Sequence, residues 1–295
     1  MKVMITGGSG FIGAWIMQRL LARGVSVTVL DTRCDPSLAS EIIGQGAESI
    51  NWCEGDVGDR AAVAKAATGC DLIIHLAAIL TPDCQADPIR GTHINYIGTL
   101  NVFEVAIEMG HSKVLYMSSA SVYGPDDGEV PAPTTQYGVF KLAGEGSARC
   151  YWEDHGISSI GFRPLVVYGP GRETGLSAGP TLACRAAARG ESFTIPLSGE
   201  TDFVYVEDVA RVFDAACDAS ISGAHVWNIP GEVAPMEQFI AEVRNTVPDC
   251  DLSIEGPLVP VAARRTLHEP LAGMPAHSVT GLAAGIASTI AYYRQ

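Results

Sequence analysis

The chain carries few charged side chains, and most of them are acidic. Charged residues make up 18% of its 295 residues, with 19 Lys and Arg against 33 Asp and Glu and a formal net charge of −14. A nucleic-acid-binding protein normally presents a basic face, and no run of Lys or Arg occurs here. We therefore expect no nucleic-acid partner, and the acidity indicates solubility rather than a function.

Long apolar runs are lacking as well. None reaches the roughly 18 residues that are needed to span a bilayer. The N-terminal segment has one Lys followed by a strand-like run, which is not the layout of a signal peptide. We therefore expect no membrane partner and a cytoplasmic location.

Paired cysteines and the spacings of metal ligands are also missing. The eight cysteines are scattered without a C-x-x-C pair, which is typical of small buried side chains in a reducing compartment. His75, His93, His111 and His155 are far apart in the pattern and show no ligand spacing. We expect no metal site.

What the chain does contain is an alternation of strand-like and helical segments. Apolar residues make up 47% of the sequence, enough for one large α/β domain and a smaller lobe. The expected strands are Lys2–Thr6, Val25–Leu30, Ile50–Cys53, Asp71–Leu76, Lys113–Met117 and Ile157–Phe162. The expected helices are Phe11–Arg23, Arg60–Ala67, Ile94–Met109 and Gln136–His155. Such alternation predicts an α/β fold with a Rossmann-type doubly wound parallel sheet, which binds ligands at the carboxyl ends of its strands.

The rhythm changes after Arg163, where Pro and Gly interrupt the chain. Further helices are expected over Thr181–Arg189, Asp208–Ala219, Met236–Val247 and Thr280–Tyr293, and the Pro-rich segment Asp249–His277 is expected to be irregular. We predict a nucleotide-binding domain over residues 1–163, to which residues 202–230 return. Residues 164–201 and 231–295 would form a small C-terminal α+β substrate lobe.

A glycine-rich turn joins the first strand to the first helix. Gly8, Gly10 and Gly13 fit the pattern G-x-G-x-x-G, and Gly7 in place of Gly8 gives the looser G-x-x-G-x-x-G. These glycines permit a tight turn and let the backbone approach a pyrophosphate closely. The phosphates would then meet free N–H groups and the positive end of the helix dipole.

Asp31 ends the second strand, 18 residues after Gly13. An acid near this spacing binds the ribose 2′-hydroxyl of a dinucleotide and would repel a 2′-phosphate, so NAD is favoured over NADP. Arg33, two residues on, would soften that preference. The residues expected to contact the cofactor are Gly7, Gly10, Phe11, Ile12, Gly13, Asp31, Asp56, Val57, Leu76, Ala77, Ala78, Tyr137 and Lys141.

Tyr137 and Lys141 are four residues apart and therefore share one face of a helix. Oxidising an alcohol requires a base, and a free tyrosine with a pKa near ~10 is a poor base at pH 7. A neighbouring ammonium and a cationic nicotinamide would lower that pKa by about three units, through roughly 4 kcal/mol of preferential phenolate stabilisation. Ser119, which follows the fifth strand, would hold the substrate oxygen.

Together these segments resemble the extended short-chain dehydrogenase/reductase family, whose best-known branch is the NAD-dependent sugar epimerases and dehydratases. The segments that carry the resemblance are Thr6–Gly13, Asp31, His75–Ala78, Asn95–Asn101, Ser118–Gly124, the Tyr137/Lys141 pair, Arg163–Gly171 and Asp202–Ala210. The resemblance covers roughly residues 2–230. It implies that Ser119, Tyr137 and Lys141 are catalytic, and that the chain forms a homodimer through the helices that contain Asn95 and Tyr137.

Three departures from that family bear on the substrate. Thr201 stands where nucleotide-sugar members carry an arginine that grips the sugar diphosphate, and threonine cannot replace that charge. Ala120 follows Ser119, so the Asp-Glu pair of the sugar dehydratases is missing. The usual C-terminal L-G-W/F-x-P segment is replaced by Ala262–Arg265 and an irregular stretch. Arg172, Arg185 or Arg189 is an alternative source of that positive charge, and the spacing along the sequence does not choose among the three.

The sequence therefore favours an NAD-dependent oxidoreductase that interconverts a secondary alcohol and a ketone or lactone. Its small-molecule substrate would be a sugar, sugar acid, polyol or related hydroxy compound. Substrate contacts are expected from Thr81, Ser119, Val167, Arg172 and Thr181. One alternative is a nucleotide-sugar epimerase with tightly bound NAD and transient oxidation; another is a non-catalytic NAD(P)-sensing binding protein.

Overall fold

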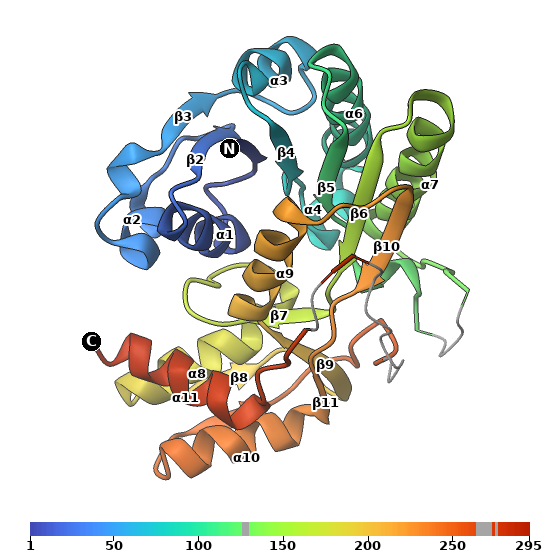
Figure 1. Cartoon of the computed structure of the whole chain (residues 1–295). Coiled ribbons are helices and arrows are strands. Elements are labelled where there is room, and N and C mark those ends of the chain that lie inside the picture. Colours follow the sequence, from blue (N-terminus) through green and yellow to red (C-terminus); the bar gives the residue numbers. More distant parts are fainter. Residues whose placement is uncertain (126–129, 264–272, 275–276) are drawn as a thin grey trace.

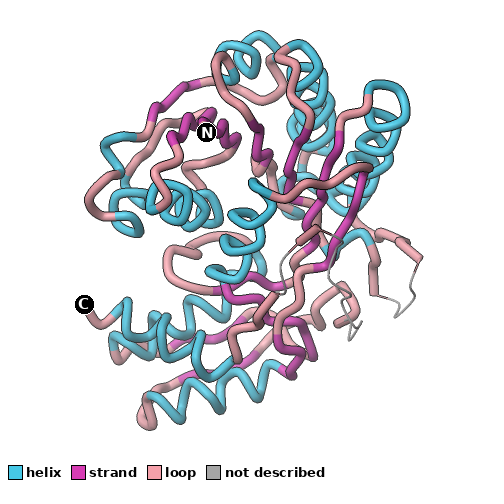
Figure 2. Tube along the Cα trace, viewed as in Figure 1, coloured by secondary structure: helices cyan, strands magenta, loops and turns pink. Residues whose placement is uncertain are grey.

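The main sheet has seven parallel strands, and its order reverses in the middle (Figures 1 and 2). The computed structural model describes residues 1–125, 130–263, 273–274 and 277–295. The strands are β1 (Lys2–Thr6), β2 (Ser26–Asp31), β3 (Asn51–Glu54), β4 (Leu72–His75), β5 (Lys113–Met117), β6 (Ser158–Arg163) and β10 (Ala224–Asn228). They run in the order β10-β6-β5-β4-β1-β2-β3. The reversal between β1 and β4 opens a crevice at the carboxyl ends of the strands, where ligands of such sheets bind.

Helices cover both faces of this sheet because side chains alternate along each strand. Val3 and Ile5 point into one core, and Met4 points into the other. The first core is closed by α1 (Phe11–Ala22), α2 (Ser37–Ile43) and α9 (Val206–Asp218). The second core is closed by α3 (Arg60–Ala67), α6 (Gly98–Glu108) and α7 (Gln136–His155).

A smaller lobe lies beside the carboxyl ends of the main sheet (Figure 1). Its strands are β7 (Val166–Tyr168), β9 (Glu200–Tyr205) and β11 (Glu232–Pro235) in one sheet, and β8 (Phe193–Ile195) and β12 (Leu252–Ile254) in another. Its helices are α8 (Gly179–Arg189), α10 (Met236–Thr246) and α11 (Leu282–Tyr293). A separate core of stacked and edge-on rings from Tyr168, Phe203 and Phe239 holds it together. The predicted fold class, a doubly wound parallel sheet with a small α+β lobe, is confirmed.

Most predicted elements are present, but the predicted helix Ile94–Met109 is not one regular helix. A π-helical segment, Thr92–Ile97, precedes α6. Within it, the Asn95 side chain exchanges two hydrogen bonds of 2.8 Å with the backbone of Ile79. Such widened turns often occur at functional sites. Short elements that the sequence did not predict are η1 (Ala47–Ser49), α4 (Thr81–Ala86), α5 (Pro88–Gly91), η3 (Ala120–Val122) and η4 (Leu176–Ala178).

The residues from 202 to 230 divide between the two parts of the molecule. Helix α9 packs on the main sheet and β10 pairs with β6, whereas β9 belongs to the small sheet with β7 and β11. Strand β12 lies within the segment expected to be irregular, and much of the remainder of that segment falls outside the described residues. No helix in the described ranges is long and apolar enough to cross a membrane.

Candidate active site

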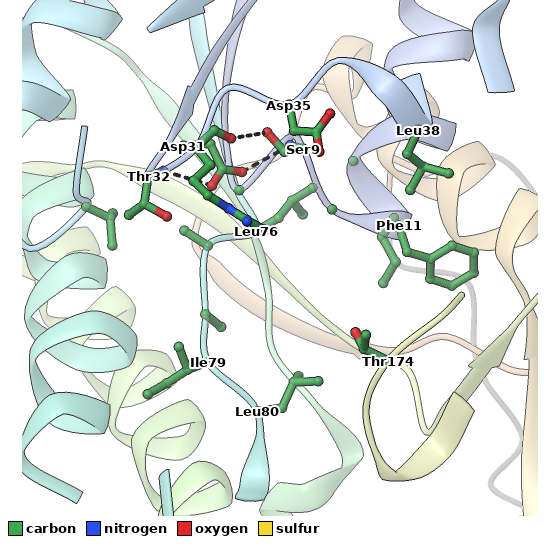
Figure 3. Close-up of a pocket in the computed structure, with 18 of the residues that line it drawn as sticks. Ser9, Phe11, Asp31, Thr32, Asp35, Leu38, Leu76, Ile79, Leu80 and Thr174 are labelled. Atoms are coloured by element: carbon green, nitrogen blue, oxygen red, sulfur yellow. Dashed lines mark hydrogen bonds between the residues drawn. The ribbon is translucent and has the colours of Figure 1, made fainter. Parts of the chain in front are cut away.

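A cavity of about 840 Å³ lies at the carboxyl ends of β1, β2 and β4 and extends to the loop after β7. Figure 3 shows Asp31, Ser9 and Asp35 at one end and Ile79, Leu80 and Thr174 towards the other. Its wall includes most of the residues that the sequence predicted to contact the cofactor. These are Gly7, Gly10, Phe11, Ile12, Gly13, Asp31, Asp56, Val57, Leu76, Ala77 and Ala78. Tyr137 and Lys141 are not part of this wall. An elongated cavity of this size fits a dinucleotide.

The glycine turn is shaped for close approach of the backbone. Gly7 has a φ of +71°, and a Cβ there would lie 2.7 Å from the Ala77 backbone. A Cβ on Gly13 would lie 2.6 Å from the Gly8 carbonyl oxygen. Helix α1 begins after Gly10 without a side-chain cap, which leaves its first N–H groups available to a phosphate. These features fit a dinucleotide pyrophosphate.

Asp31 is fixed at the end of β2 by backbone donors (Figure 3). Its Oδ2 accepts a hydrogen bond from Ser9 N–H over 3.1 Å, and its Oδ1 accepts one from Thr32 N–H over 2.8 Å. The carboxylate therefore lies in the cavity wall as an acceptor and a negative charge, which suits a ribose hydroxyl and opposes a 2′-phosphate.

Ser119, Tyr137 and Lys141 come together beside the end of β5. Ser119 is the N-cap of η3, and its hydroxyl hydrogen-bonds the Tyr137 side chain. Lys141 is buried, and its Nζ donates to the Met117 carbonyl over 2.7 Å while lying 5.7 Å from the Tyr137 ring centroid. Gly138 allows this arrangement, because a Cβ at that position would collide with the Ser121 carbonyl oxygen.

The electrostatics of Tyr137 in the protein alone are dominated by burial. Burial raises the pKa of Tyr137 to about 12, and the Ser119 hydrogen bond and the positive charge of Arg172 oppose that shift. The prediction that the Lys141 ammonium and a cationic nicotinamide together lower the pKa of Tyr137 concerns the cofactor complex and stays a prediction. The ammonium is directed at the Met117 carbonyl, and burial lowers the pKa of Lys141 to about 8.

A buried ionic network supports this region, and no motif in the sequence indicated it. Arg163 Nε donates to Glu145 Oε1 over 2.6 Å, and Arg163 Nη1 donates to the Tyr123 hydroxyl over 2.6 Å. Ser118 also donates to Glu145, and Tyr123 donates to Asn228 Oδ1 over 3.1 Å. The network ties α7 to β6 and β10, so that the helix carrying Tyr137 is held against the sheet.

His75 has a structural environment. Its ring nitrogens lie 2.7 Å from the Thr6 hydroxyl and 3.0 Å from the Thr99 hydroxyl, and burial lowers its pKa to about 3. The neutral ring joins β4 to β1 and α6. In the described part of the chain, no group of three His, Cys, Asp or Glu side chains is placed to hold a metal ion.

The predicted substrate residues have different surroundings. Arg172 lines the cavity, and Thr81 begins α4 directly after the cavity residue Leu80. Val167 is buried in the core, and Thr181 is fully buried with its hydroxyl accepting from Gly169 N–H over 3.1 Å. Val167 and Thr181 therefore have packing roles here, and their contact with substrate stays a prediction.

The two other candidate arginines, Arg185 and Arg189, are absent from the cavity wall, and several residues of that wall were not predicted. Arg185 forms an ion pair with Glu173, and Arg189 is exposed at the end of α8. Of Ala262–Arg265, the two arginines lie outside the described residues. The sequence reasoning missed several residues of the cavity wall, namely Ser9, Thr32, Asp35, Ser37, Leu38, Glu41, Ile79, Leu80, Arg90, Ile94, Met117, Glu173 and Thr174. Ile79 and Leu80 continue the segment Leu76–Ala78 after β4 and were open to prediction, whereas Leu38 and Glu41 lie on a helix without a motif.

Comparison with known proteins agrees with this geometry. The model of the NAD dependent epimerase/dehydratase family matches residues 3–230. A UDP-glucose 4-epimerase of Mycolicibacterium smegmatis is 29% identical over 225 residues, which cover 72% of each chain. A putative UDP-glucose 4-epimerase of Methanocaldococcus jannaschii is 30% identical over 221 residues, which cover 71% of each chain.

Solved structures match over the whole length. The UDP-glucose 4-epimerase of Thermus thermophilus, in complex with NAD, has a TM-score of 0.83 at 26% identity and covers 100% of this chain and 99% of its own. A GalE-like L-threonine dehydrogenase from Cupriavidus necator has a TM-score of 0.84 and covers 99% of both chains, but at 22% identity it shows the fold alone. The chain belongs to the NAD-dependent epimerase/dehydratase family. It is an NAD-dependent enzyme of the extended short-chain dehydrogenase/reductase type.

Proposed function

We propose that this enzyme interconverts a secondary alcohol and a ketone or lactone on a small sugar, sugar acid, polyol or related hydroxy compound. The observation that carries the proposal is the cluster of Ser119, Tyr137 and Lys141 beside the dinucleotide-shaped cavity. It combines a proton acceptor, a hydroxyl that binds the substrate oxygen and a buried ammonium.

The cofactor would occupy the cavity found at the strand ends. Its pyrophosphate would meet the N–H groups at the start of α1, and its adenosine ribose would meet Asp31. When bound, NAD supplies the acceptor for the hydride of the alcohol carbon. Lys141 would bind the nicotinamide ribose through its ammonium.

The proton chemistry belongs to Tyr137 and Ser119. In oxidation, the Tyr137 oxygen takes the proton of the substrate hydroxyl, while the Ser119 hydroxyl hydrogen-bonds the oxygen of that substrate hydroxyl. Since the pKa of Tyr137 is about 12 in the protein alone, the phenolate needs positive charge nearby, and Arg172 supplies part of it. In reduction, the same phenol returns the proton to the developing alkoxide.

Thr201 supports a substrate that carries no nucleotide diphosphate group. This residue is fully buried in β9, and its hydroxyl has no hydrogen-bond partner in the described part of the chain. A buried neutral hydroxyl cannot replace an arginine that grips a diphosphate. A substrate smaller than a nucleotide sugar is therefore favoured.

The test is a screen of sugars, sugar acids and polyols with NAD, followed by the absorbance of NADH. We expect turnover that depends on stoichiometric NAD, and we expect Tyr137→Phe to lower kcat by about 10²–10⁴-fold, the usual contribution of general acid–base catalysis. Binding of NADH by Tyr137→Phe, measured by fluorescence, should stay within a few-fold of the wild type. Unchanged turnover in this variant would contradict the assignment.

The names of the relatives favour one alternative, a nucleotide-sugar epimerase that keeps its NAD. In that reaction the oxidised sugar is reduced again in the same site, so no NADH accumulates. If the purified protein turns over a UDP-sugar without added NAD, the epimerase assignment is correct and the dehydrogenase assignment is not.

We also propose a homodimer in a reducing compartment such as the cytoplasm. Support for the dimer comes from Val139 on α7, a valine with 43% of its surface exposed on a helix that the family uses for association. Support for the compartment comes from the cysteines, all eight of which are free thiols in the structure. We keep the division into two lobes at about residue 163 as a proposal as well.

A further inference from the structure

The loop that follows β7 places Arg172 in the wall of the cavity. Trp15 Nε1 donates to the Pro170 carbonyl over 2.9 Å, and Gly171 N–H donates to the Tyr293 hydroxyl over 3.1 Å. Trp15 belongs to α1 and Tyr293 to α11, so regular elements from both lobes hold the loop next to Arg172. The guanidinium is therefore positioned by the scaffold rather than by an exposed loop tip.

Arg172 is a partly buried cation that forms no ion pair with any described residue. Its Nη2 donates to Ser177 Oγ over 2.9 Å, and its Cζ lies 5.6 Å from the Phe11 ring centroid. Its Nε is buried and has no hydrogen-bond partner among the residues that the structure describes. A guanidinium has five N–H donors, and burying it without a counter-charge is unfavourable. An anionic ligand would satisfy both the charge and the donors.

Two anions are available to such a group, the cofactor phosphates and an acid group of the substrate. The phosphates already have the N–H groups at the start of α1. The positive charge of Arg172 also opposes the upward shift of the Tyr137 pKa. A Cβ on Gly175 would lie 2.8 Å from Leu80 Cδ1 and 3.4 Å from Arg172 Nη2, so the guanidinium is next to the wall after β4. The guanidinium therefore lies between Phe11 at the start of α1 and Leu80 after β4.

We propose that Arg172 binds the carboxylate of a hydroxy-acid substrate, whose alcohol group meets Tyr137 and Ser119. This inference rests on the proposed function and names its substrate class. The carboxylate is not changed in the reaction: the alcohol carbon loses a hydride to NAD, and its hydroxyl proton goes to Tyr137. Arg172 thus orients the acid by a charge-assisted, bidentate contact.

Binding is tested on the NADH complex, in which a hydroxy acid can bind without being oxidised. The probes are straight-chain aldonates of three to six carbons and the alditols of the same lengths, titrated by NADH fluorescence. For at least one length, we expect the aldonate to bind at least about tenfold more tightly than the alditol, as charge-assisted contacts imply. Arg172→Met should remove that difference, Arg172→Lys should restore part of it, and Arg294→Met, at an exposed arginine, should keep it.

Three results would overturn the proposal. The first is aldonates and alditols of every length binding alike or not at all to the wild type. The second is an aldonate preference that survives in Arg172→Met. The third is Arg172→Met weakening NADH itself by the same factor, because Arg172 would then serve the cofactor phosphates.

A separate measurement distinguishes this inference from the proposed function. If aldonates bind through Arg172 but no NADH forms when NAD is supplied, the carboxylate site stands and the oxidoreductase assignment fails. If alditols or neutral sugars are oxidised through Tyr137 while no aldonate binds or is oxidised, the oxidoreductase assignment stands and the carboxylate site fails.

Discussion

At the residue scale, Asp31 is the side chain that we propose sets the preference for NAD over NADP. Its carboxylate is held by the N–H groups of Ser9 and Thr32, so it cannot easily turn away from the cavity. Arg33 lies in the same wall and would attract a 2′-phosphate once the acid is gone.

We expect Asp31→Ala to lower the ratio of kcat/KM for NAD over NADP by at least about tenfold, because a charge-assisted contact and a repulsion are lost together. Parallel initial-rate measurements with the two cofactors give this ratio. Asp35→Asn is the matched control, since Asp35 lines the same cavity but binds the Ser37 backbone N–H. An unchanged ratio in Asp31→Ala would mean that the acid does not contact the ribose.

Asp202 is a second residue whose surroundings make a prediction. It is 7% exposed, and burial raises its pKa to about 7, while a hydrogen bond from Gly231 N–H opposes the shift. A raised pKa in the folded state means that the native protein keeps a proton that the unfolded chain has already lost. The free energy of unfolding therefore falls as pH rises from about 4 to about 7.

We expect Asp202→Asn to be less sensitive to pH in this range, because the amide does not ionise. Between about pH 4 and pH 7, the Asp202 carboxyl lowers the free energy of unfolding by at most about 4 kcal/mol, and this change should be lost in Asp202→Asn. The figure is an upper bound, because the group keeps some exposure to solvent. Urea unfolding at several pH values measures it, with the exposed Asp251→Asn as control. Identical slopes in wild type and Asp202→Asn would contradict the prediction.

At the scale of elements, α7 carries Tyr137 and Lys141, the two proposed catalytic residues of one helix face. It begins at Gln136 with Thr135 as its N-cap, whose hydroxyl accepts from Gly138 N–H over 3.1 Å. Tyr137 is in its first turn, so the cap defines the local backbone of the proton acceptor. Further along, Glu145 anchors the helix to Arg163 in β6.

We expect Thr135→Ala to lower the free energy of unfolding by about 1 kcal/mol, the usual loss for an N-cap. Thr135→Ser keeps the hydroxyl and should retain most of that stability. Because the first turn frays without its cap, kcat of Thr135→Ala should fall while KM for NAD changes little. Denaturant unfolding and steady-state kinetics of the two variants measure these effects. If Thr135→Ala and Thr135→Ser are equally stable, the Thr135 hydroxyl does not stabilise the start of α7.

At the scale of the whole molecule, the cavity depends on contacts between the two lobes. The loop with Arg172 is fixed by Trp15 of the main domain and by Tyr293 of the C-terminal helix. Tyr292, on that same helix, donates to Glu41 of α2 over 2.5 Å. The last helix of the chain therefore joins the loop and the nucleotide side of the cavity.

Association of two chains is the prediction at this scale. We expect the protein to sediment as a dimer, and Val139→Glu to shift it to a monomer, because a charge buried in an apolar interface is unfavourable. Val226→Glu, at a valine with 42% exposure on the edge strand β10, should remain dimeric. Analytical ultracentrifugation reads this directly, and a monomeric wild type or a dimeric Val139→Glu would contradict the proposed interface.

Much of the fold followed from local patterns. Strands β1 and β5 and helices α3 and α7 have the bounds that the sequence predicted, since their apolar periodicity and flanking turn residues are strong. The glycine turn, Asp31 and the Tyr137/Lys141 pair were identified because each needs a fixed short spacing. The small lobe was predicted only in outline, because β7, β8 and β12 have three residues each and carry too little periodicity to be recognised.

What the sequence by itself determined is the architecture, the family and the placement of the glycine turn and Asp31 at the cavity, all of which rest on short-range spacing. Only the tertiary structure decided the electrostatics. It aimed the Lys141 ammonium at the Met117 carbonyl, brought Arg172 close enough to act on Tyr137, and buried Thr201 and Asp202. Charge and desolvation act through space between residues far apart in the chain, and no spacing along the sequence encodes those distances.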